Sequence, residues 1–249
     1  MNYDIGHLLR RWDYTPGATQ VRQVKGRDGL PKLQLRLDLG ILQMEVEGRP
    51  DGKKPMGHAS WLDFYQARLR EHQEEAGGET GFGLAAEDCE RLHHEAIQYY
   101  HRAVCLGAIG DHAGVVRDAQ HNLDILHLLA GLSTFPQAAA LRHALGPQVV
   151  VLRTRSLAEP AIAKKRLAEA IRAIEQGIAD VKAIRAGSED EGEEDAPEVE
   201  FLEGWLKDLR GKAPLSPRQK LERQLDEAVQ REDYETAAKV RDQLKRLEA

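Results

Sequence analysis

The sequence predicts an α+β protein that is mostly α-helical and carries a small antiparallel sheet near its N-terminus. Leucines alternate with polar residues over 32–39, which is the period of a half-buried strand. From about residue 85 onward, apolar residues instead recur at the helical spacings of three and four. Glycine-rich and acidic stretches divide the chain. The expected parts are a sheet with a covering helix (1–75), a helical region (84–187), an acidic linker (188–198), a short amphipathic helix (199–213) and a helical hairpin (214–249).

The predicted sheet occupies the first part of the chain. Leucines stand at the odd positions from 33 to 39, and after Gly40 the apolar positions become even. This change indicates a bulge or a bend at the glycine. The stretch 19–25 precedes the turn sequence GRDG and can supply an antiparallel neighbour. Ser60, with Asp63 three residues later, has the pattern of a helix start, and we expect this helix to cover the sheet.

The middle of the chain is predicted to be helical. Helices over about 85–108 and 112–131 flank the break IGDHAG and should fold back on each other. The segment 136–157 contains PQVVVLRTR, which is compatible with a short strand or with the start of a helix. Pro160 suits the first turn of the next helix. The apolar stripe of that helix should face another helix and consists of Leu167, Ile171, Ile174, Ile178 and Val181.

The C-terminal segment predicts two short helices joined by a tight turn. Ser216 as N-cap, Pro217 at the first helical position and Gln219 at the third form a capping box. Asp233 can cap the second helix, and Glu235 suits its positive end. The expected inner faces form a coiled-coil-like seam of Leu221, Leu225, Ala228 and Val229 against Tyr234, Ala237, Ala238, Val240, Leu244 and Leu247. So short a module, without a metal or a disulfide, usually needs a partner.

This segment, LERQLDEAVQREDYETAAKVRDQLKRL, resembles the UVR motif of the bacterial excision-repair subunit UvrB, the incision nuclease UvrC, an activator of protein arginine kinases and some Clp-type unfoldases. Tyr234 stands where phenylalanine is more usual. The resemblance implies a protein-interaction hairpin and no chemistry of its own. The matching residues are Leu221, Leu225, Ala228, Glu232, Asp233, Tyr234, Glu235, Ala237, Ala238, Arg241, Asp242, Leu244 and Leu247.

The resemblance leads us to expect a bacterial adaptor or scaffold with no catalytic residue and no cofactor. Its partner would be a protein that carries a UVR-type hairpin, or a second copy of this chain, with excision repair or a Clp-type unfoldase as the setting. The expected partner-binding residues are Leu221, Leu225, Val229, Tyr234, Ala237, Ala238, Arg241, Leu244 and Leu247.

Charge and motifs exclude several other classes. The net charge is −6, and setting aside the eight acids of 188–200 leaves +2 for the rest, which argues against direct nucleic-acid binding. No phosphate-binding GxxxxGK[ST] motif and no paired CxxC motif occurs. No signal peptide and no membrane span is recognisable, so we expect a cytoplasmic protein with both cysteines reduced.

The alternative is a metal-binding or enzymatic helical domain centred on the histidine-rich helices 85–131. Acid-x-x-His spacing places both side chains on one helix face and occurs at Glu90, Asp118 and Asp124, each followed by a histidine. The metal-ligand candidates are Cys89, His93, His101, Cys105 and His121. The same histidines are also explained as surface or partner-facing residues of a polar helix, and this interpretation is favoured. The glycine- and lysine-containing segment 48–57 could touch a phosphate or be a plain loop tip.

Overall fold

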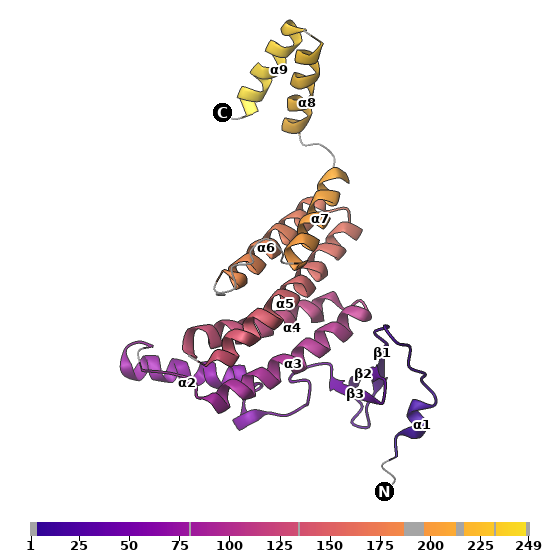
Figure 1. Ribbon diagram of the computed structural model, residues 1–249, viewed down its shortest axis with the longest axis vertical. Coiled ribbons are helices and arrows are strands. Elements are labelled where there is room, and N and C mark those ends of the chain that lie inside the picture. The colour runs from indigo at the N-terminus through magenta and orange to yellow at the C-terminus, as the bar shows by residue number, and fades with distance from the viewer. Residues whose placement is uncertain are drawn as a thin grey trace. The chain divides into compact units, whose positions relative to one another are not determined.

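The structure is a computed structural model that describes residues 4–79, 81–133, 135–186, 197–212, 217–231 and 233–247. Its described part is mostly helical with one three-stranded antiparallel sheet, which confirms the predicted fold class (Figure 1). Ser216 and residues 188–196 of the predicted acidic linker lie outside the described residues. The chain divides into two units, Met1–Leu206 and Lys207–Ala249. In the ranges that the structure describes, no helix combines the length and the apolar character needed to cross a membrane.

The sheet contains β1 (Val21–Lys25), β2 (Pro31–Leu37) and β3 (Gly40–Glu45) in that order, after a short helix α1 (Gly6–Leu9). Leu37 pairs with Gly40, so only two residues form the turn between β2 and β3. The change of apolar parity at Gly40 therefore marks a tight hairpin and not a bulge within one strand. Leu39, at the turn, is 88% exposed.

The sheet has a helical cover, but a different helix provides it than the sequence predicted. Leu33 and Met44 pack into one apolar cluster with Ala103 and Leu106 of α3 (Ala86–Ala108). The helix that Ser60 caps, α2 (Trp61–Ala76), instead packs its own buried residues against α3 and α4 (His112–Leu132) in another cluster. The short 3-10 turn Pro55–Gly57 precedes α2, which lies away from the sheet in Figure 1.

Four helices, α3 to α6, follow one another and pack in series. α3 and α4 form the predicted helical hairpin, and α5 (Pro136–Ala163) packs against both α4 and α6 (Leu167–Arg185). The ambiguous segment 136–157 is therefore helical throughout. After α6, α7 (Pro197–Lys212) is tied to it by ion pairs of Lys182 with Glu203 and Arg185 with Glu198.

Pro160 does not start a helix but lies inside α5, as does Pro147. An interior proline lacks the N–H that would bond to the carbonyl four residues earlier. The long packed surfaces of α5 on both neighbours, α4 and α6, outweigh this loss. α5 ends at Ala163, and Lys165 takes a left-handed conformation with φ 59° before α6 begins.

α6 packs against α5, and its predicted stripe lies at or beside this contact: Ile174 and Val181 are fully buried, and Leu167, Ile171 and Ile178 are half-buried. Its buried residues are Ala170, Ile174, Gly177 and Val181. A Cβ atom on Gly177 would lie 2.2 Å from Oγ1 of Thr154 in α5. The close approach of the two helices at this point therefore requires glycine.

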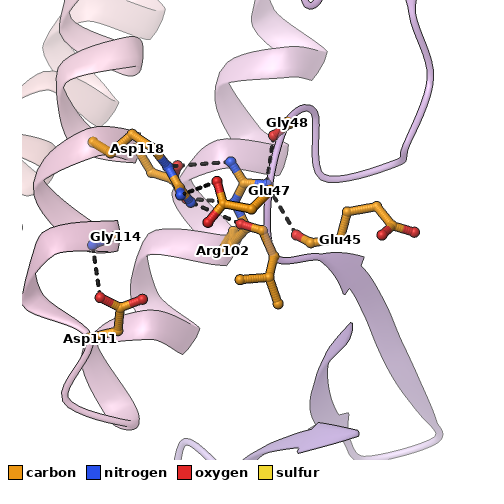
Figure 2. A network of polar contacts seen from close by, with 9 residues as sticks. Glu45, Glu47, Gly48, Arg102, Asp111, Gly114 and Asp118 are labelled. Carbon is orange, nitrogen blue, oxygen red and sulfur yellow. Dashed lines mark hydrogen bonds and ion pairs between the residues drawn. The ribbon is translucent and has the colours of Figure 1, made fainter. Parts of the chain in front are cut away.

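A buried ion pair joins the sheet to the helical hairpin (Figure 2). Arg102 donates from Nε and Nη2 to the two carboxylate oxygens of Asp118, at 2.6 and 2.8 Å. Its Nη1 donates to the carbonyls of Glu45, at 3.1 Å, and Gly48, at 2.7 Å. Both charged residues are fully buried. A buried guanidinium is tolerated only when its hydrogen-bond donors are paired. The bonds of Arg102 to the carbonyls of Glu45 and Gly48 therefore hold the end of β3 against α3 and α4.

Replacing Asp118 by asparagine should lower the free energy of unfolding by about 3–5 kcal/mol, because it leaves the buried charge of Arg102 without its counter-ion. Urea unfolding measures this loss. The matched control is Glu159→Gln, which removes one partner of an exposed pair with Arg155 and should change stability by no more than about 0.5 kcal/mol. Equal losses in the two variants would contradict the role given to Asp118.

Gly177→Ala should destabilise the chain by about 1–3 kcal/mol, because the added methyl group collides with Thr154. The loss should shrink when Thr154 is alanine. Gly204→Ala is the control, since this glycine is exposed in α7 with open space around it, and it should gain about 0.5–1 kcal/mol. Thermal unfolding of Gly177→Ala, Thr154→Ala, the double variant and Gly204→Ala measures these changes in stability. A gain at both glycines would mean that α5 and α6 do not approach as described.

Candidate protein-interaction hairpin

The C-terminal unit contains two helices, α8 (Pro217–Gln230) and α9 (Tyr234–Leu247), that pack against each other. Asp233 starts α9 as predicted: its carboxylate accepts the N–H of Thr236 at 3.0 Å and the hydroxyl of Thr236 at 2.7 Å. These bonds lower the pKa of Asp233. The contribution of the cap is therefore present above the ordinary pKa of an aspartate and is lost as the pH falls through the lowered value.

The seam between α8 and α9 is narrow. Among the described side chains of the hairpin, only Ala228, Ala237 and Val240 are fully buried. A second set is half-buried and flanks them: Leu221, Leu225, Ala238 and Leu244. Alanines allow the two helices to approach closely, but they bury little apolar area. The side chains of Gln219 and Leu247 lie outside the described residues.

Two apolar residues predicted for the inner faces lie outside the seam. Val229 is 51% exposed and Tyr234 is 70% exposed. Tyr234 is the first residue of α9, beside the turn. Arg241 is also exposed and pairs with its neighbour Asp242, while Lys239 and Glu235, one turn apart, form an ion pair at 2.7 Å. The predicted partner-binding set thus divides into a seam and an outer surface.

The cysteines and histidines proposed as metal ligands do not converge. Cys105 is fully buried in the cluster under the sheet, and burial raises its thiol pKa to about 12, whereas His101 one turn earlier is exposed. Cys89 lies in the other apolar cluster, with Sγ 3.2 Å from the hydroxyl of Ser133. Within the described residues, no three His, Cys, Asp or Glu side chains gather as a metal site.

His121 takes part in a buried polar network that the sequence did not predict. Its Nε2 lies 3.0 Å from Oε1 of Glu95, and its ring stacks on Tyr99 with 3.7 Å between centroids. Asp118, the acid three residues before His121, pairs with Arg102 instead. The sequence contains one sign that Glu95 and Arg102 are buried: both fall on the same apolar helix face as Leu92 and Leu106.

The structure also shows the surroundings of two other candidate sites, the 48–57 loop and His93. The start of the 48–57 loop is tied down, since the Gly48 carbonyl accepts from Arg102 and Arg49 is buried beside Glu95, while Lys53 and Lys54 remain exposed. His93 lies exposed at the rim of a cleft of about 580 Å³, whose floor is formed by Leu129, Ala138 and Leu141.

Comparison with known proteins adds one finding. The family model described as "UvrB/uvrC motif" matches residues 218–249, which are the two helices of this hairpin and the residues that end the chain. No curated protein and no solved structure matches the chain. The C-terminal hairpin therefore carries a UVR motif, as its resemblance predicted.

Proposed function

We propose that the protein is a non-enzymatic adaptor, which binds another protein through the outer surface of its UVR hairpin. One observation carries this proposal: the hairpin fully buries few of its apolar side chains and leaves two large ones exposed. Only Ala228, Ala237 and Val240 are fully buried among its described side chains, while Val229 and Tyr234 are turned outward. A partner that covered these two residues would supply the burial that the seam lacks.

The kind of partner follows from the charge of the hairpin and from its motif. Basic and acidic residues alternate along both helices, so neither sign dominates and electrostatic steering is weak. Apolar contact, with tyrosine as a rigid anchor, is then the main source of affinity. A second UVR-type hairpin, in another cytoplasmic protein or in a second copy of this chain, offers a surface of the same kind. Excision-repair subunits and Clp-type unfoldases carry such hairpins.

The metal-binding alternative has no comparable support. Its candidate ligands are separated by burial, since Cys105 lies under the sheet and His101 faces solvent. Asp118 and His121, one of the three acid-x-x-His pairs, each have a different partner.

Tyr234→Ser should reduce capture of the partner by about tenfold or more, because it removes an exposed aromatic anchor without touching the seam. A pull-down from a bacterial lysate, quantified by mass spectrometry, compares this variant with the full chain and with a chain ending at Arg210. Sedimentation of the same samples detects self-association.

Glu235→Gln is the matched control, because Glu235 is the next residue along α9 and is equally exposed. It should leave capture unchanged. Ala237→Glu places a charge in the seam and should abolish capture by opening the hairpin. If the chain ending at Arg210 captured the same proteins as the full chain, the adaptor role of the hairpin would be ruled out.

A further inference from the structure

α2 is held to the rest of its unit by few contacts for its length. Of its sixteen residues, only Leu62 and Tyr65 are fully buried. Trp61, Phe64 and Leu69 pack at the edge of the same apolar cluster and are half-buried. The apolar area that attaches α2 is therefore concentrated near its first two turns.

The polar attachment of α2 lies at the same end. Glu95 of α3 is fully buried, and its carboxylate accepts the backbone N–H of Trp61 at 2.8 Å and of Leu62 at 3.1 Å. The first N–H groups of a helix have no partner within the helix. A carboxylate placed there also interacts favourably with the positive end of the helix dipole. Glu95 thus acts as an N-terminal acceptor that another helix supplies.

Glu95 is held in place by groups that do not belong to α2. Its Oε1 is 3.0 Å from Nε2 of His121, and its Oε2 is 3.5 Å from Nε of Arg49. A second polar contact lies close by, where the hydroxyl of Tyr65 donates to Asp88 of α3 at 2.6 Å. The acceptors for α2 are therefore fixed on the α3–α4 surface whether or not α2 is attached.

Beyond Tyr65, α2 also makes contacts within its own segment. Arg68 lies over the rings of Phe64 and Phe82, and Gln73 donates to Glu79 at 2.8 Å. The contact of Gln73 with Glu79 can move together with the helix. The contact of Arg68 with Phe82 must break when α2 leaves, because Phe82 follows Gly81 and packs against the core cluster.

Glycines in left-handed conformations stand on both sides of α2. Gly57 precedes it with φ 83°, and Gly77 and Gly81 follow it with φ 74° and 91°. The space where their Cβ atoms would lie is open. Glycine changes its backbone conformation more readily than other residues, so both connections can act as hinges.

We infer that α2 is a strap that leaves the α3–α4 surface as one unit, with Glu95 as its latch, while α3 to α6 stay folded. Such elements open with less free energy than the whole domain requires. Detachment uncovers the part of the core cluster against which Leu62 and Tyr65 pack. This opening is independent of the C-terminal hairpin.

Hydrogen–deuterium exchange of the full chain, followed by mass spectrometry, tests the strap. Peptides from 61–76 should exchange at least about tenfold faster than those from α4 and α5, with similar protection along α2. Ordinary fraying would give protection that rises steadily from the helix ends. Fraying of this kind, or exchange in α2 as slow as in α4, would overturn the proposal.

Variants test the latch. Glu95→Gln should accelerate exchange in α2 by about tenfold, because it removes the charge from two hydrogen bonds, and should leave α5 and α6 unchanged. Glu90→Gln, on the exposed face of the same helix, should leave α2 unchanged. Tyr65→Phe removes the bond to Asp88 and the weaker one accepted from Arg91, and should accelerate α2 by about fivefold, which keeps the strap testable if Glu95→Gln fails to fold. Equal acceleration of all helices would show that Glu95 and Tyr65 support the whole core and latch nothing.

Discussion

The buried pair of Arg102 and Asp118 is the interaction on which the N-terminal unit depends. Each charge would be costly alone in the interior, and together they are tolerated because their hydrogen-bonding groups find partners. Asp118 also accepts from Arg117, and Arg102 bonds to two carbonyls at the end of β3. These carbonyls are available only if the chain after β3 runs beside α3. The ion pair therefore specifies where the sheet sits on the helices, which the small apolar cluster of Leu33 and Met44 does not do alone.

Local patterns predicted the elements well, because alternation, capping and turn chemistry are properties of neighbouring residues. The β2–β3 pair, the Ser60 and Asp233 caps and the α3–α4 hairpin are of this kind. Long-range choices were not predictable in the same way. Glu95 and Arg102 are polar residues on apolar helix faces, and their partners come from segments more than fifteen residues away. The sequence marks such positions as unusual but does not name the partner.

Errors at Pro160 and Tyr234 have one physical origin. A proline predicts a helix boundary and an apolar helix face predicts burial, both from neighbouring residues alone. Whether either prediction holds depends on which other segments pack against the helix. Pro160 stays inside α5 because that helix is packed on both sides, and Tyr234 stays outside the seam as the first residue of α9, beside the turn. A motif match to 218–249 identifies the hairpin but does not tell which of its apolar residues are used internally.

The two units are stabilised in different ways, and this difference bears on function. In the N-terminal unit, fully buried charges such as Glu95, Arg102 and Asp118 fix one arrangement of the segments, because any other would leave a charge unpaired. In the hairpin, the described ion pairs are exposed and contribute little, and the seam is built largely from alanine. A marginal hairpin loses little when it exchanges its own contacts for those of a partner. Its few buried residues therefore fit the association that we propose for it, whereas the buried ion pairs hold the N-terminal unit in one arrangement.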